Sequence, residues 1–132
     1  MKKILSILLL TVPLFIFGQT QEEINKVLGE VSNKMNQNLP MVVDQYTTVK
    51  TTYGGMGKVM YIYQLDTDYF IDYGITQSQW LELQTELMTN TFCTDPSMKT
   101  FRDLKVDVIW KYLDLSGGFV GRIKLNYLDC YQ

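Results

Sequence analysis

The first eighteen residues have the layout of a secretory signal peptide, and they decide which part of the chain has to fold. A basic head, Met1-Lys2-Lys3, precedes an apolar run from Ile4 to Phe17, and the small residue Gly18 comes before a polar segment. The apolar run is too short for a transmembrane helix, which needs about 20 residues. We therefore predict a cleaved signal peptide at residues 1–18 and a single domain at residues 19–132.

The predicted cleavage site also bears on where the protein resides. No cysteine lies near Gly18, so the residue that carries the lipid of a bacterial lipoprotein is missing. We therefore expect a periplasmic or secreted protein that has no stable membrane insertion after cleavage.

The predicted domain is mildly acidic. The whole chain has 12 basic and 14 acidic residues, and removing Lys2 and Lys3 leaves ten basic residues against the same fourteen acids. A nucleic-acid-binding protein needs clustered Lys and Arg for its phosphate contacts, so this balance argues against one. By the same reasoning we expect no basic patch for anionic lipid.

Cysteine and histidine usage narrows the chemistry. The only two cysteines, Cys93 and Cys130, both lie in the exported part, where an even pair is most simply interpreted as a disulfide, the alternative being two buried thiols. The chain has no histidine, which excludes Ser-His-Asp and Cys-His catalysis and ordinary His-ligated zinc. We expect no cofactor, no metal site and no catalytic residue.

The hydrophobic pattern predicts an α+β fold. Apolar residues recur at helical spacing in three segments and in strand-like runs in four, with glycine-containing turns inside each pair of strands. Residues 69–75 are expected to form a loop with a short strand at its start. We expect a four-stranded antiparallel sheet of two hairpins with helices on one face, in the order α-β-β-α-α-β-β. The expected helices are 21–37, 77–92 and 97–103, and the expected strands are 46–53, 59–65, 106–113 and 119–128.

The glycine-rich segment from Tyr53 to Lys58 is the first candidate site. Its Gly57-Lys58 pair resembles part of a phosphate-binding loop, but Val59 follows where Ser or Thr would hold magnesium. A hairpin turn is the favoured interpretation. An alternative is that the turn, with Tyr53, Met56 and Lys58, contacts a partner.

Two tyrosines form the second candidate. Tyr61 and Tyr63 share one face of a predicted strand. If no helix covers that face, they form an aromatic platform for a peptide or a glycan; otherwise they belong to the core. The pattern leaves both alternatives open.

The acidic residues offer weaker candidates. Asp66, Asp68 and Asp72 could present oxygen ligands to calcium, but the segment lacks the glycine and glutamate of an EF-hand loop, so a solvated loop is favoured. The other acids are scattered and form no catalytic pair.

Several short motifs resemble a group of small exported bacterial proteins whose activity is not established. The most specific combination is Leu39-Pro40-Met41 followed by Asp44, together with the terminal Asp129-Cys130; Cys93-Thr94, Met98 and the segment from Tyr112 to Gly118 add to it. The resemblance implies a fold and a disulfide but no functional residue. Some members are lipoproteins, and this chain departs from them in lacking the lipid-bearing cysteine.

These observations favour a non-enzymatic binding protein of the bacterial envelope, which acts on a protein or peptide through the open sheet face and the turn at 54–58. An inhibitor or immunity-type protein for a secreted enzyme is the first alternative. An enzyme that uses tyrosine or carboxylates as acid and base is the second.

Overall fold

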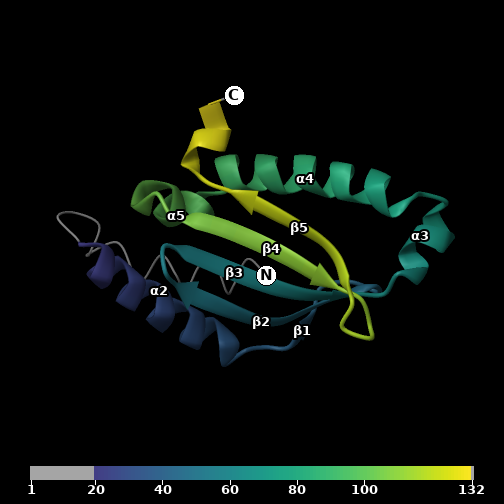
Figure 1. Ribbon diagram of the computed structural model, residues 1–132, viewed down its shortest axis with the longest axis horizontal. Coiled ribbons are helices and arrows are strands. Elements are labelled where there is room, and N and C mark those ends of the chain that lie inside the picture. The colour runs from purple at the N-terminus through teal and green to yellow at the C-terminus, as the bar shows by residue number, and fades with distance from the viewer. Residues whose placement is uncertain (1–19, 132) are drawn as a thin grey trace.

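The computed structural model describes residues 20–131, so the predicted signal peptide lies outside the described residues. Helices and strands cover most of this range (Figure 1). The helices are α2 (Gln21–Asn36), α3 (Asp68–Tyr73), α4 (Gln77–Thr94) and α5 (Lys99–Leu104), with the 3-10 turns η2 (Pro96–Met98) and η3 (Tyr127–Tyr131). The strands are β1 (Met41–Val42), β2 (Thr47–Gly55), β3 (Lys58–Leu65), β4 (Asp107–Leu113) and β5 (Phe119–Leu125). Within residues 20–131, no helix combines the length and apolar character needed to cross a membrane.

The sheet has five strands in the order β1-β2-β3-β4-β5, and it is mixed. Both predicted hairpins are present, but β3 and β4 run parallel to each other. The prediction of four antiparallel strands was therefore wrong in two respects. The long helix α4 returns the chain to the starting end of β3 before β4 begins, and the two-residue strand β1 adds an edge beside β2.

Both long helices pack on the same face of the sheet, as expected. The Ser32 hydroxyl of α2 lies 2.8 Å from the Thr52 hydroxyl of β2. On α4, the Phe92 ring lies edge-on to Trp110 of β4, with ring centroids 6.2 Å apart. In Figure 1, α2 lies beside β2 and α4 lies along β5, so the two helices lie near opposite edges of the sheet.

Local signals set the helix boundaries. Thr20 caps α2 by accepting from the Glu23 N–H, and Thr76 with Gln79 forms a capping box at the start of α4. The predicted third helix begins as η2, where the Asp95 carboxylate accepts from the Ser97 N–H, and continues as α5.

The segment after β3 is a helix, so the prediction of a loop with a short strand at 69–75 was wrong. Asp66 accepts from the Asp68 N–H at the start of α3, and Gly74 ends it in the left-handed conformation with φ 64°. Tyr69 and Tyr73 lie one helical turn apart with ring centroids 4.5 Å from each other, as expected for residues four apart on one face of a helix.

Candidate binding site

A groove lies between α4 and the segment that joins β1 to β2, on the helix-covered face of the sheet. Its volume is about 320 Å³. We call it the aromatic groove. Its lining residues are Val43, Asp44, Thr47, Tyr63, Leu65, Tyr69, Trp80, Gln84, Leu87, Met88 and Tyr112.

Three aromatic rings form the inner wall of the aromatic groove. Tyr63 of β3 and Tyr112 of β4 are cross-strand partners with ring centroids 4.9 Å apart, and Trp80 of α4 stands edge-on to Tyr112 at the same separation. Edge-to-face packing of this kind adds to the stabilisation from burial. The wall is therefore rigid and largely apolar before any ligand arrives.

The Tyr112 hydroxyl in this wall is held uncharged. Gln84 donates a hydrogen bond to the Tyr112 hydroxyl, N to O 3.0 Å. Burial raises the pKa of Tyr112 to about 12, and the Gln84 hydrogen bond opposes that shift. Because the hydroxyl stays neutral at ordinary pH, the wall presents no charge to a bound group.

The rim of the aromatic groove exposes aliphatic side chains to water. Leu87 of α4 is 56 % exposed and Val43 is 43 % exposed. Leu83, one helical turn before Leu87, is 59 % exposed and continues the apolar stripe beyond the cavity. Asp44 is the one charged residue among those lining the groove. Clustered exposed apolar groups beside a cavity are typical of binding sites.

One end of the groove is fixed by an aromatic cluster around α3. The Tyr46 hydroxyl donates to the Asp72 carboxylate at 2.6 Å, and the Tyr46 ring packs edge-on to Tyr69 and Tyr73. The hydrogen bond to Asp72 is the main reason that the pKa of Tyr46 is raised to about 12. These contacts hold α3 against the segment that joins β1 to β2, which contributes Val43.

The two tyrosines predicted as a candidate platform are in the core. Tyr61 and Tyr63 are each 2 % exposed and face the helix layer, where Tyr61 stacks on Trp110. The core alternative is therefore confirmed, and the open platform is excluded. Tyr63 nevertheless contributes to the aromatic groove, and the Tyr61 hydroxyl is buried without a hydrogen-bond partner among the described residues.

The other predicted contact residues lie at the tip of the β2–β3 hairpin, away from α4. Met56 is 77 % exposed and Tyr53 is 44 % exposed, whereas Lys58 is half-buried. Met56 and Gly57 have φ of 52° and 75°, which is the geometry of a tight hairpin turn. The favoured hairpin interpretation is confirmed, and a partner contact there stays a prediction.

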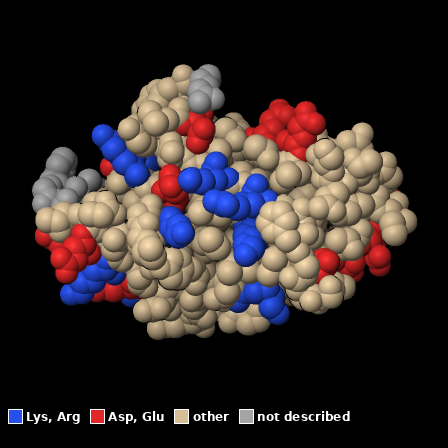
Figure 2. Space-filling view, in the orientation of Figure 1, with Lys and Arg blue, Asp and Glu red and all other residues tan. Residues whose placement is uncertain are grey.

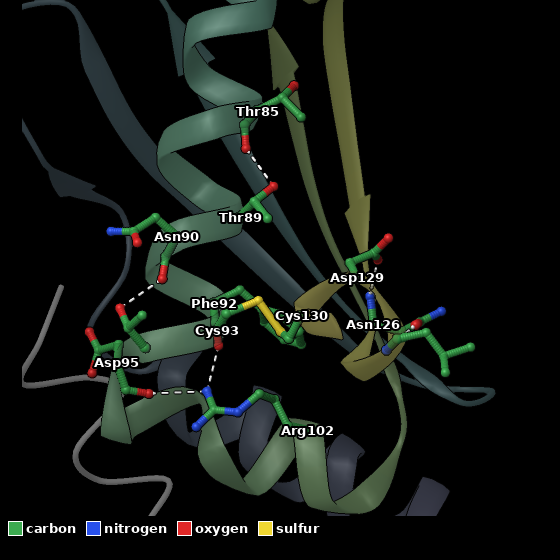
Figure 3. Close-up of a disulfide and its surroundings, with 12 residues drawn as sticks. Thr85, Thr89, Asn90, Phe92, Cys93, Asp95, Arg102, Asn126, Asp129 and Cys130 are labelled. Carbon is green, nitrogen blue, oxygen red and sulfur yellow. Dashed lines mark hydrogen bonds between the residues drawn. A yellow bond between two sulfur atoms is a disulfide. The ribbon is translucent and has the colours of Figure 1, made fainter. Parts of the chain in front are cut away.

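The predicted disulfide is present and joins the helix layer to the end of the chain (Figure 3). Cys93 of α4 and Cys130 of η3 are bonded, with Cα atoms 5.4 Å apart. Nearby, the Arg102 guanidinium of α5 donates to the carbonyl oxygens of Phe92 and Asp95, which ties α5 to the end of α4. A hollow of about 790 Å³ beside the disulfide is lined by charged as well as apolar residues.

The acidic residues and cysteines of the described chain do not gather into a metal site. Residues 20–131 contain no group of three or more His, Cys, Asp or Glu side chains placed to hold a metal ion. Two of the predicted calcium candidates have local roles, because Asp66 accepts from the Asp68 N–H at the start of α3 and Asp72 accepts from the Tyr46 hydroxyl.

Comparison with known proteins identifies the fold. No family model matches the chain, and a search of curated proteins finds no match. Among solved structures, a candidate secreted protein from Pseudomonas aeruginosa matches with a TM-score of 0.69 and 8% identity, over 86% of this chain and 99% of that one. The type 2 secretion system pilotin EpsS from Vibrio vulnificus matches with a TM-score of 0.67 and 15% identity, over 83% and 94% of the two chains. The pilotin AspS from Vibrio cholerae gives a TM-score of 0.65 and 11% identity over the same shares. The chain therefore has the fold of these secreted and secretion-system proteins.

Proposed function

We propose that this protein is a non-enzymatic binding module of the bacterial envelope whose aromatic groove takes an apolar segment of a partner protein. The observation that carries the proposal is the pair of exposed leucines, Leu83 and Leu87, beside a groove with a rigid aromatic wall. A soluble protein exposes such a stripe at a cost unless a partner covers it.

The extent of the stripe favours a polypeptide over a small molecule. A volume of about 320 Å³ is at the lower end for a ligand pocket. Leu83 lies outside the cavity lining but one helical turn from Leu87, so the apolar surface is longer than the cavity. An amphipathic helix or an extended apolar segment would cover both leucines and insert a side chain between Trp80 and Val43.

The disulfide supports an exported location, and the fold supports a partner from a protein-secretion machinery. Disulfides persist in oxidising compartments, which agrees with the predicted export of the chain. Two of the similar structures are pilotins of type 2 secretion systems. A component of a protein-secretion machinery is therefore the partner class we propose.

A pair of leucine variants tests the groove. Leu87→Glu places a charge on its rim, and Leu128→Glu is a matched control because Leu128 of η3 is also 56 % exposed but lies outside the groove lining. We expect the wild-type protein and Leu128→Glu to retain the same protein from envelope extract, and Leu87→Glu to lose it. Equal retention by both variants, or no retained protein at all, would contradict the proposal.

The remaining roles stay predictions. The predicted use of Tyr53, Met56 and Lys58 in partner contact concerns the opposite side of the molecule from the groove. No observation favours an inhibitor or immunity-type role, or an enzyme, over the binding module.

A further inference from the structure

The face of the sheet opposite the helices has its own character. Alternation along the strands and the pairing register place side chains on it in transverse rows. Ile62, Lys111 and Arg122 form one row, and Met60, Ile109 and Lys124 form the next. Ile109 is 2 % exposed although both long helices lie on the other face of the sheet. The aliphatic parts of the long side chains beside it, such as those of Met60 and Lys124, therefore cover it.

Basic residues gather on this face. Five of the ten basic residues in the described chain lie there, on four adjacent strands, and Figure 2 shows Lys and Arg side chains over the middle of the sheet. Asp107, the register partner of Lys58, is also on this face, and its carboxylate lies 3.6 Å from the Lys124 ammonium. We call this surface the basic sheet face; its cations are Lys58, Lys111, Arg122 and Lys124, together with Lys50, an exposed residue at the bulge of β2 between buried Val49 and outward-facing Thr51.

Many of the acids lie away from this face, so positive and negative charges are unevenly distributed over the molecule. No Lys or Arg occurs between Lys58 and Lys99, a stretch that includes α3 and α4 and carries six acids. The acidic balance of the whole chain therefore hides a local excess of positive charge, and the expectation of no basic patch was wrong. Composition reports the sum of the charges but not where they lie.

Two like charges face each other at the centre of the basic sheet face, and their repulsion destabilises the sheet. Lys111 and Arg122 are directly opposite each other on antiparallel strands. Like charges in opposed positions destabilise a sheet, and no acid in the described chain forms an ion pair with either residue. An external anion would relieve this repulsion, so the arrangement suits a surface that binds negative charge.

Exposed apolar side chains flank the cations. The row next to Lys111 and Arg122 runs across the whole sheet and ends in Val42 of β1 and Phe119 of β5. Val42 is 72 % exposed and Phe119 is 63 % exposed. Cations beside exposed apolar groups on one broad face are the combination that binds the interfacial region of an anionic bilayer.

We propose that the basic sheet face docks on an anionic phospholipid bilayer, with Lys50, Lys111 and Arg122 against lipid phosphates and Val42 and Phe119 at the headgroup boundary. The cations are spread over four strands, which span about 14 Å at ~4.8 Å per strand. A broad, flat array of mostly lysines suits a plane of many phosphates better than one small anion. In this arrangement the aromatic groove faces away from the membrane and stays free for its partner.

A vesicle-binding assay tests this proposal. The exported protein is purified from the periplasm and checked by intact mass. The probes are vesicles of phosphatidylcholine with 30% phosphatidylglycerol, and vesicles of phosphatidylcholine alone. We expect binding to the anionic vesicles only, with loss of binding in 0.5 M NaCl because salt screens the attraction.

Two double variants with the same net charge distinguish the contribution of the basic sheet face to vesicle binding from the effect of the protein's net charge. Lys111→Gln with Arg122→Gln should weaken binding about 25-fold, or about fivefold for each charge removed. Lys26→Gln with Lys34→Gln, on exposed positions of α2, should stay within about twofold of wild type. Circular dichroism checks that both variants are folded.

Three results would overturn the proposal: equal binding to both kinds of vesicle, equal weakening in the two double variants, or retention on an acidic polypeptide column without vesicle binding. The last result would reassign the face to an acidic protein. Leu87→Glu should leave vesicle binding unchanged, so the failure of this proposal is distinguishable from failure of the groove.

Discussion

Asn36, at the last residue of α2, joins that helix to strand β2. Its side-chain oxygen accepts from the Thr52 N–H at 2.8 Å and from the Thr52 hydroxyl at 2.9 Å, while its amide nitrogen donates to the Thr52 carbonyl at 3.0 Å. A side chain that satisfies both backbone groups of one strand residue fixes the position of the helix along the strand.

We expect Asn36→Ala to lower the free energy of unfolding by about 2 kcal/mol, because the backbone N–H and carbonyl of Thr52 would each lose a hydrogen bond to Asn36 that contributes about 1 kcal/mol. Urea denaturation measures the change. Asn33→Ala, at an exposed position of the same helix, is the control and should change stability by less than about 0.5 kcal/mol. Equal effects of the two variants would show that the network contributes little.

Two glycines at the contact of α2 with the hairpin respond oppositely to the same substitution. A Cβ atom on Gly54 would lie 2.0 Å from the carbonyl oxygen of Leu28, which is backbone and cannot move aside, whereas a Cβ on Gly29 has its nearest contact at 3.5 Å. We expect Gly54→Ala to destabilise the protein by about 2 kcal/mol or more. Gly29→Ala should stabilise it by up to about 1 kcal/mol through helix propensity. Thermal unfolding of the two variants should shift the midpoint in opposite directions; shifts of the same sign would refute the close approach.

At the scale of elements, the local sequence pattern predicted the features that depend on neighbouring residues, namely helix boundaries and hairpin turns. Caps and periodicity located α2 and α4 within about two residues, and glycine turns located both hairpins. The parallel pairing of β3 with β4 was not predictable in this way, because it depends on how a crossover of about forty residues packs. Strand β1 escaped prediction because it has two residues, and α3 because its aromatic residues are also typical of strands.

The disulfide stabilises the junction between α4 and η3. Replacing both cysteines, Cys93→Ala with Cys130→Ala, should lower the free energy of unfolding by about 2–4 kcal/mol, because the unfolded chain gains the freedom that the closed loop removes. Guanidinium denaturation measures this, and reduced wild-type protein should match the double variant. Unchanged midpoints in both would contradict a stabilising role.

At the scale of the molecule, the candidate site depends on segments that the sequence separates. The aromatic groove combines residues from the connection between β1 and β2, from β2, β3 and β4, and from α3 and α4. Alternation correctly placed Tyr61 and Tyr63 on one face of β3. It could not say which face the helices cover, since both faces of an isolated strand are equivalent.

The buried tyrosines at the centre of the molecule give its stability a defined dependence on alkaline pH. Burial raises the pKa of Tyr112 to about 12, and burial also raises the pKa values of Tyr61 and Tyr63. In the unfolded chain a tyrosine ionises near pH 10. The neutral hydroxyls therefore contribute their full stability below pH 10, and this contribution is lost as the pH rises from about 10 towards 12.

We expect the free energy of unfolding to fall over that range by up to about 1.4 kcal/mol per pH unit for each buried tyrosine. Absorbance at 295 nm follows tyrosinate, and near-UV circular dichroism follows the packed aromatic core. If Tyr61, Tyr63 and Tyr112 ionise only when the core opens, a step in absorbance should coincide with the loss of the dichroism signal. Tyr112→Phe removes one linked proton, so its unfolding free energy should depend less steeply on pH. If the step in absorbance comes before the loss of dichroism, hydroxide reaches these hydroxyls while the protein is still folded. That result would contradict the burial of the three tyrosines in the core.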